Sequence, residues 1–378
     1  MATKRKPLHP TPASTLNFRP TLANDRSEGG RGTKPTADPT SVSNALVHIL
    51  QHVCKRILFV DIKKKLFVYF GCVFLLSLIA DFTSVPKSYF SKKDNLFNLY
   101  FVKVAWGWTL LLSLPFVAFS SFTYCCGQRD KVLKHCSRLL IATIFWYFWT
   151  NLYNYFDNFY GRCNVKNPKY QKRSACLAEG FHWSSIDISG HCFILIYSTL
   201  VLIEEARAIN CWEGISDLIR EEGYARSIDD KTSRPLRCLS SDDLDALRTY
   251  YIKFSPYIRG LFIAITFLTL LWDIMLLSTI IYFHNMLEKL IAYVVAVGTW
   301  ALTYQIWYKI PGIIPPMPGE GVFKYQDSKP AKEVKLKPRP SLSNRIPGPK
   351  FMGMPLKVPP SAQNNTSSND QEQSNNVL

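Results

Sequence analysis

Six apolar runs, each close to 20 residues long, alternate with polar segments along the middle of the chain, while both ends are polar. A helix of about 20 apolar residues is long enough to cross the hydrocarbon core of a bilayer. The pattern therefore predicts an all-α integral membrane protein with six transmembrane helices. The predicted spans are residues 66–82, 99–122, 139–156, 188–203, 258–283 and 287–308.

The two ends of the chain differ in composition from the spans. Residues 1–46 are rich in Pro, Thr, Ser and basic residues, and residues 311–378 are rich in Pro, Lys and Asn. Such segments have few apolar side chains to bury, so we expect two disordered tails around a membrane domain of residues 47–310. Apolar residues at helical spacing in 47–59, followed by three lysines from Lys63, predict an interfacial helix before the first span.

The formal net charge of +17 can indicate either a nucleic-acid partner or a membrane orientation. No zinc-finger spacing, RNA-binding signature or helix-turn-helix pattern accompanies the charge, so we expect no nucleic-acid partner. Six spans put both termini on one side, and 35 of the 45 Lys and Arg residues lie in segments on that side, against 9 on the other. Because positive residues favour the cytosolic side, both termini are predicted to be cytosolic.

Two histidines stand at the ends of predicted spans on the non-cytosolic side. His191 opens the fourth span directly after Ser189 and Gly190, and His284 closes the fifth. An ionisable side chain in a span is costly and is usually kept for function. Because imidazole has a pKa near neutrality, one histidine can attack a phosphorus atom while the other protonates the leaving oxygen. The alternative is that each ring only anchors its helix at the interface.

Two carboxylates are candidates for orienting these histidines. Asp187 lies four residues before His191 and shares its face if the helix is continuous; the alternative is a helix cap formed with Ser184. Glu288 lies four residues after His284 and is either an orienting carboxylate or an ordinary helix-start glutamate.

Other polar residues in or near the spans also have two interpretations. Lys103, four residues inside the second span, either snorkels to the interface or meets an anion. Asp273, eleven residues before His284, either lines the same cavity or makes a polar contact between spans. Cys163 and Cys176 lie in one non-cytosolic loop and either form a disulfide or stay as free thiols. No dense Cys/His or carboxylate cluster suggests a metal, so we expect no metal and no cofactor.

Several stretches resemble known membrane protein families. Ser189, Gly190 and His191 form the core of the second motif of the lipid phosphate phosphatases, in which the serine and glycine help to bind phosphate. A wider set of stretches, in order along the chain, resembles the fat storage-inducing transmembrane protein family. These stretches are residues 88–91, Asn95, 98–106, 187–191, 204–205, 282–285, 303–304 and 307–308. The resemblance covers about residues 55–310.

That resemblance implies a six-span enzyme of the endoplasmic reticulum membrane, with cytosolic termini and a role in lipid droplet formation. It implies hydrolysis of the pyrophosphate of long-chain acyl-CoA to acyl-4'-phosphopantetheine and adenosine 3',5'-bisphosphate. By motif position, His191 is the acid on the leaving group and His284 is the nucleophile. The implied partners are long-chain acyl-CoA, the neutral lipids triglyceride and diacylglycerol, and ER-shaping or cytoskeletal proteins.

The chain departs from the lipid phosphatase pattern in two motifs. The first motif, a lysine followed seven residues later by Arg-Pro, is absent, and Ser278 stands where the third motif has an arginine. Phosphate must then be held by other groups, for which Lys103, Lys92, Lys93 and backbone N–H groups are candidates. Two alternatives stay open: a phosphomonoesterase acting on phosphatidic or lysophosphatidic acid, and a non-enzymatic protein that binds triglyceride or diacylglycerol and partitions it into droplets.

Overall fold

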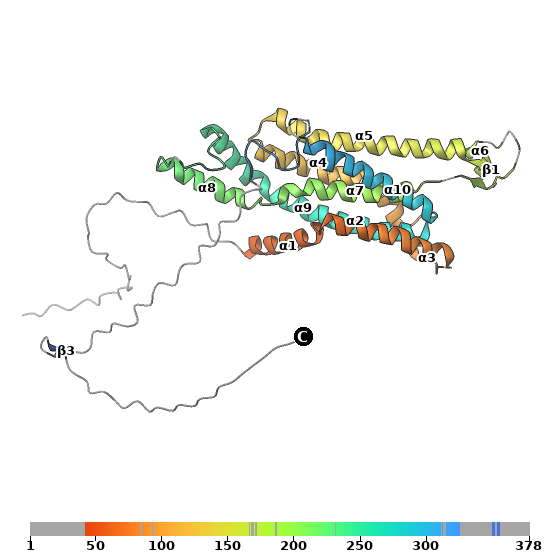
Figure 1. Ribbon diagram of the computed structural model, residues 1–378, viewed down its shortest axis with the longest axis horizontal. Coiled ribbons are helices and arrows are strands. Elements are labelled where there is room, and N and C mark those ends of the chain that lie inside the picture. Colours follow the sequence, from red (N-terminus) through yellow and green to blue (C-terminus); the bar gives the residue numbers. More distant parts are fainter. Residues whose placement is uncertain are drawn as a thin grey trace, which may run out of the picture. The chain divides into compact units, whose positions relative to one another are not determined.

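The computed structural model is mostly helical over the residues it describes (Figure 1). These are residues 42–83, 85–92, 94–165, 167, 170, 172–185, 187–230, 232–310, 312, 315–325, 350–351 and 354–355. The α-helices are α1 (Val42–Leu58), α2 (Ile62–Gly71), α3 (Ser77–Phe82), α4 (Ala105–Tyr124), α5 (Arg129–Tyr160), α6 (Arg173–Ala178), α7 (Gly190–Ala206), α8 (Gly214–Ser227), α9 (Ser241–Tyr282) and α10 (Met286–Trp300). Short π- or 3-10-helical turns are η1 (Cys72–Leu76), η2 (Tyr89–Ser91), η3 (Asn98–Val102), η5 (Arg207–Ile209), η6 (Ala301–Ile306) and η7 (Trp307–Lys309), and the strands are β1 (Arg162–Cys163), β2 (Trp183–Ser184), β3 (Lys350–Phe351) and β4 (Met354–Pro355).

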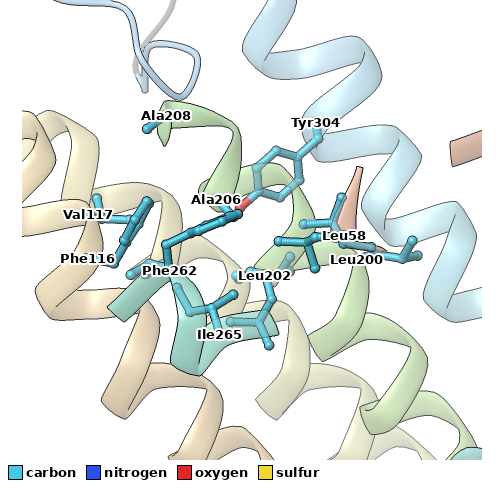
Figure 2. Packing of buried hydrophobic residues seen from close by; sticks show 14 of the residues in the cluster. Leu58, Phe116, Val117, Leu200, Leu202, Ala206, Ala208, Phe262, Ile265 and Tyr304 are labelled. Atoms are coloured by element: carbon cyan, nitrogen blue, oxygen red, sulfur yellow. The ribbon is translucent and has the colours of Figure 1, made fainter. Parts of the chain in front are cut away.

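Helix α7 lies at the centre of the packed helices. Every residue from Cys192 to Ala206 is buried, and the helix packs against α4, α5, α9 and α10. A helix that is apolar on all its faces is stable only where other helices surround it. Figure 2 shows its C-terminal part, where Leu200 and Leu202 lie in one buried cluster with Phe262 of α9 and Phe116 of α4.

Within the described residues, four helical segments are long and apolar enough to cross a membrane: Ile62–Phe82, Ala105–Tyr124, Ser241–Tyr282 and Met286–Lys309. They contain most of the first, second, fifth and sixth predicted spans. The third predicted span lies in α5, which is helical but too polar to be counted with these four segments. The fourth lies in α7, which is helical but too short. Helix α5 contains many Trp, Tyr and Asn residues, and α7 has 17 residues. The all-α membrane class is therefore supported, and the number of six spans stays a prediction.

Helix α9 begins well before the span predicted from residue 258. Ser240 caps it, because its hydroxyl accepts a hydrogen bond from the Asp243 N–H at 3.0 Å, and Asp242 and Asp243 add negative charge to the first turn. Both features stabilise the start of a helix. Pro256 lies inside the helix, where it removes one backbone hydrogen bond. The helix ends at Tyr282, two residues before the predicted catalytic histidine.

The packed part of the chain extends past the predicted boundaries of the membrane domain. Helix α1 begins at Val42, inside the predicted N-terminal tail. Beyond residue 310, Phe323 and Tyr325 are buried, and the Tyr325 hydroxyl donates to the Ala208 carbonyl at 2.8 Å. A composition rich in Pro, Lys and Asn predicted disorder from residue 311 onward, but these two buried aromatic side chains supply apolar surface that anchors the segment around them. Residues 1–41 and most of 326–378 lie outside the described residues.

The chain divides into two units, residues 1–328 and 329–378. In the second unit, β3 pairs antiparallel with β4, with Lys350 opposite Pro355. The functional candidates all lie in the first unit.

Candidate active site

His191 and His284 line the same cavity, which has a volume of about 600 Å³. The other lining residues are Asp94, Asn98, Lys103, Asp187, Tyr282 and Phe283. Three separate parts of the chain supply these side chains: the segment that precedes α4, the start of α7, and the connection between α9 and α10. The structure therefore brings the two predicted histidines together.

His284 stands in the short connection between α9 and α10 and has a left-handed backbone, with φ of 60°. A non-glycine residue in this conformation costs about 1 kcal/mol or more. Two side chains from nearby segments hold this connection in place. The Met286 N–H donates to Asp81 at 2.9 Å, and the Asn285 N–H donates to Glu288 at 3.1 Å. The strained backbone aims a side chain that is 19% exposed into the cavity.

Glu288 connects the two halves of the site. Its Oε2 lies 3.4 Å from His284 Nδ1, and its Oε1 accepts a hydrogen bond from the Asp187 N–H at 3.3 Å. Glu288 also closes a capping box with Asn285 at the start of α10. Glu288 is therefore a helix-start glutamate, as one interpretation had it, and it also lies close enough to His284 for the orienting role, which stays a prediction. A carboxylate beside Nδ1 favours the proton on that nitrogen, which leaves the Nε2 lone pair of His284 for attack.

His191 is the second residue of α7, which begins at Gly190. The N-cap is Ser189, whose buried hydroxyl accepts a hydrogen bond from the Cys192 N–H at 3.3 Å. Ser189 is not among the residues that line the cavity, so its hydroxyl fixes the start of the helix. A Cβ on Gly190 would meet nothing within 4 Å. The open space around Gly190 leaves room for an anion at the N–H groups of the first turn, which attract negative charge.

Lys103, Asn98 and Asp94 come from the segment that leads into α4. The Lys103 N–H donates to the Asn98 carbonyl at 3.0 Å, which is the five-residue hydrogen bond of a π-helical turn. This turn places Lys103 and Asn98 on one side, where both line the cavity. Because Lys103 lines the cavity, its position favours the interpretation that it binds an anion over the one that it snorkels to the interface.

The cavity role of Asn98 and Asp94 was missed from the sequence. Asn98 was noted only as part of the family resemblance, and Asp94 was not considered. A signal for Asn98 was its five-residue spacing from Lys103, which is informative only if a π-helical turn is assumed. The candidate phosphate-binding residue Lys93 lies outside the described residues.

The expectation that Asp187 shares a helical face with His191 is wrong. Helix α7 begins at Gly190, so Asp187 lies outside it, and its Oδ2 lies 4.0 Å from His284 Nδ1. The alternative cap with Ser184 is also wrong, because Ser184 lies in β2 and Ser189 caps the helix. Asp187 therefore faces the histidine of the other segment.

Asp273 does not line this cavity. It accepts hydrogen bonds from Lys65 Nζ at 3.1 Å and from the Tyr69 hydroxyl. These two bonds link α9 to α2. It lines a different cavity of about 400 Å³, which is otherwise mostly apolar. The polar contact between spans was thus the correct interpretation, and Lys65 turns toward this partner.

A disulfide-bonded loop leads into the site. Cys163 and Cys176 form a disulfide, with their Cα atoms 5.9 Å apart, and β1 pairs antiparallel with β2. Asp157, buried near the end of α5, accepts hydrogen bonds from Trp183 Nε1 at 3.2 Å and from the Ser185 hydroxyl. These bonds tie the residues just before Asp187 to α5, and so position the entrance to α7.

The cavity combines groups suited to a phosphate ester or anhydride. Two imidazoles can act as nucleophile and acid, and a carboxylate beside His284 stabilises the imidazolium that forms when the ring attacks. Lys103 and the first N–H groups of α7 supply positive charge for phosphate oxygens.

Comparisons with known proteins agree with this chemistry. A model of the fat storage-inducing transmembrane protein family matches residues 86–304. A protein of Drosophila melanogaster named acyl-coenzyme A diphosphatase FITM2 is 46% identical over 353 residues, which cover 90% of this chain and 82% of that protein. Proteins of the same name from Xenopus tropicalis and Homo sapiens are 34% and 32% identical, covering 66% and 63% of this chain and 85% and 81% of their own length. No solved structure matches.

Proposed function

Because the chain belongs to the fat storage-inducing transmembrane protein family, we propose that it is a fatty acyl-CoA diphosphatase. The reaction adds water to the pyrophosphate of long-chain acyl-CoA and releases acyl-4'-phosphopantetheine and adenosine 3',5'-bisphosphate. The observation that carries the proposal is the placement of His191 and His284 on one cavity. A protein that only binds neutral lipid needs neither histidine there, so that alternative is not favoured.

The proposed mechanism has two steps. Nε2 of His284 attacks one phosphorus atom, the N–P bond forms as the bridging P–O bond breaks, and His191 gives a proton to the departing phosphate. Water then attacks the phosphohistidine, His191 takes the proton of that water, and His284 is released. Glu288 and Asp187 stabilise the charged ring of His284. Their carboxylate oxygens lie 3.4 Å (Glu288) and 4.0 Å (Asp187) from His284 Nδ1.

Phosphate is held here without the arginines of the lipid phosphatases. Lys103 supplies one full positive charge, and the start of α7 supplies backbone N–H groups beside Gly190. Ser189 contributes by capping that helix start. One cation in place of two arginines predicts weaker ground-state binding of the pyrophosphate than an arginine-lined site gives.

The proposed setting is the membrane of the endoplasmic reticulum, with both termini in the cytosol and the cavity on the lumenal side. The excess of Lys and Arg on the side of the termini supports this orientation. The disulfide in the loop before α7 also fits an oxidising lumen. In this setting the enzyme supports lipid droplet formation and has long-chain acyl-CoA and neutral lipids as partners.

Product analysis tests the reaction class. Purified protein in nanodiscs is given oleoyl-CoA, and the products are separated by mass spectrometry. We expect adenosine 3',5'-bisphosphate and oleoyl-phosphopantetheine in equal amounts. Free CoA would instead show thioester hydrolysis, and inorganic phosphate would show a phosphomonoesterase. Added phosphatidic acid should not be hydrolysed; its turnover at the rate of oleoyl-CoA would also contradict the proposal.

A further inference from the structure

A second polar groove lies between α8 and α9, away from the two histidines. It has a volume of about 400 Å³. One face of α8 contributes Ser216, Arg220 and Tyr224, and one face of α9 contributes Arg248, Tyr251 and Ile252. Steps of four residues in α8, and of three and four residues from Arg248 in α9, put these side chains on one face of each helix.

The groove holds two guanidinium groups whose bonding capacity is not used up by the described residues. Arg220 gives one hydrogen bond to Asp217 at 2.7 Å, and its Nε is buried with no hydrogen-bond partner there. Arg248 is exposed, and no described acidic side chain forms an ion pair with it. A buried donor without a partner is costly, so the groove is built for an added acceptor. A phosphate oxygen fits, because the planar fork of arginine binds phosphate with two parallel hydrogen bonds.

The groove opens at the level of a membrane surface. Tyr250 of α9 packs edge-on against Phe122, with ring centroids 4.8 Å apart, and Phe122 lies at the end of the membrane-spanning helix α4. Ile252, which lines the groove, is 66% exposed, and Tyr257, further along α9, is 62% exposed. Exposed apolar and tyrosine side chains at the end of a span are typical of contact with lipid. This end of α9 is opposite to the end that carries His284.

We propose that this groove binds the phosphate of an anionic phospholipid in the leaflet opposite the histidine cavity. Arg220 and Arg248 hold the phosphate oxygens, and the acyl chains run past Ile252 into the bilayer. A soluble phosphate compound has no use for the exposed apolar side chains beside the groove, which is why a lipid is favoured. The inference stands independently of the proposed diphosphatase reaction.

Native mass spectrometry of the full chain tests this proposal. Nanodiscs of phosphatidylcholine, with or without a minority of phosphatidylinositol, are prepared with wild type, Arg248→Gln, Arg220→Gln and Arg129→Gln. Arg129 is the matched control, because it is an exposed arginine at the start of α5. We expect wild type and Arg129→Gln to retain phosphatidylinositol equally. Each groove variant should bind it about tenfold more weakly, since one charge-assisted phosphate contact is lost.

Thermal unfolding in the same nanodiscs separates binding from folding. In phosphatidylcholine alone, all four proteins should unfold at the same temperature, and phosphatidylinositol should raise that temperature only for wild type and Arg129→Gln. Equal retention of phosphatidylinositol by all four proteins would overturn the proposal. If soluble inositol phosphate stabilises wild type and displaces phosphatidylinositol completely, the ligand is a soluble phosphate compound and the lipid assignment is wrong.

Discussion

The two ends of α7 carry clusters of ionisable side chains that are built in opposite ways. At its start, His191 faces an open cavity beside His284, which is 19% exposed and has a left-handed backbone. At its other end, Glu205 pairs with Arg138, and the two side chains are 0% and 1% exposed. One cluster is open and strained, and the other is closed.

The closed cluster is satisfied by the chain itself. Arg138 donates to both oxygens of Glu205, at 2.8 and 2.7 Å, and to the Pro316 carbonyl at 2.7 Å. The Tyr304 hydroxyl donates to the same carboxylate at 2.7 Å. A buried network with its partners in place fixes a structure and leaves little capacity for a ligand. The open cluster at the start of α7 still has room and hydrogen-bonding groups for a ligand. This difference distinguishes a ligand-binding site from a cluster that only stabilises the fold.

The largest expected effect is at the closed cluster. Replacing Arg138 by Ala leaves the buried Glu205 carboxylate without its cation, which costs about 3–5 kcal/mol. We expect Arg138→Ala to lower the unfolding temperature strongly or to prevent purification, as measured by fluorescence-detected size-exclusion chromatography. The exposed Arg129→Ala on the same helix is the control and should behave as wild type. If the two variants unfold alike, the closed cluster does not hold the fold.

At the open cluster, Lys103 should matter for activity and not for stability. Lys103→Gln removes the one lysine that lines the cavity within the described residues, so we expect kcat/KM for oleoyl-CoA to fall about 10- to 100-fold, the loss of one charge-assisted phosphate contact. Lys103→Arg should retain more of the activity than Lys103→Gln. The control is Lys92→Gln, an exposed lysine that does not line the cavity. A Lys103→Gln enzyme with wild-type kinetics would favour the snorkelling interpretation.

His135 makes the closed cluster sensitive to acid. It precedes the predicted third span, and its Nδ1 lies 2.8 Å from the Arg138 guanidinium, which donates to it. Burial and this guanidinium lower the pKa of His135 to about 3. The pKa is depressed in the folded state, so its stability contribution is complete above pH 6.5 and is lost as the pH falls toward 3. We expect a loss of about 2 kcal/mol by pH 5.

Thermal unfolding between pH 7 and pH 5 measures this effect. His135→Asn should show a flatter dependence on pH than wild type, while the exposed His182→Asn should keep the wild-type slope. Identical slopes for wild type and His135→Asn would show that His135 is not the group that titrates.

The smallest expected effect is the backbone strain at His284. Glycine adopts a positive φ without cost, whereas alanine does not, so His284→Gly should be more stable than His284→Ala by about 1 kcal/mol. Both variants lack the imidazole and should be inactive, so the comparison isolates the backbone. Equal unfolding free energies for the two variants would contradict stored strain at this position.

The pairing of the histidines was predictable because successive predicted spans alternate in direction, so the start of the fourth and the end of the fifth fall on the same predicted side. Glu288 was predictable because four residues separate it from His284. Asp187 was misassigned because the sequence offered two residues able to cap a helix here, Ser184 and Ser189, and the cap at Ser189 starts α7 after Asp187. The role of Asp273 was uncertain because its position on a helical face does not determine which neighbouring element it contacts. The structure shows that it contacts Lys65 of α2.

Asn98 and Asp94 were out of reach for a different reason. Asn98 begins the π-helical turn η3, and no simple periodicity describes such a turn. Asp94 lies in the irregular segment before that turn, where no helical or strand periodicity applies. The docked segment that carries Phe323 and Tyr325 was missed because composition averages over many residues, while two buried rings are enough to anchor a short segment.

The most direct test of the two-histidine site is the release of adenosine 3',5'-bisphosphate from oleoyl-CoA by the protein in nanodiscs, without added metal. We expect His191→Ala and His284→Ala each to lose activity about 10²- to 10⁴-fold while unfolding at near wild-type temperature. His182→Ala, which changes an exposed histidine of the loop that leads into α7, should keep full activity. Wild-type activity in both His191→Ala and His284→Ala would contradict the site, and inactive wild type would contradict the proposed function itself.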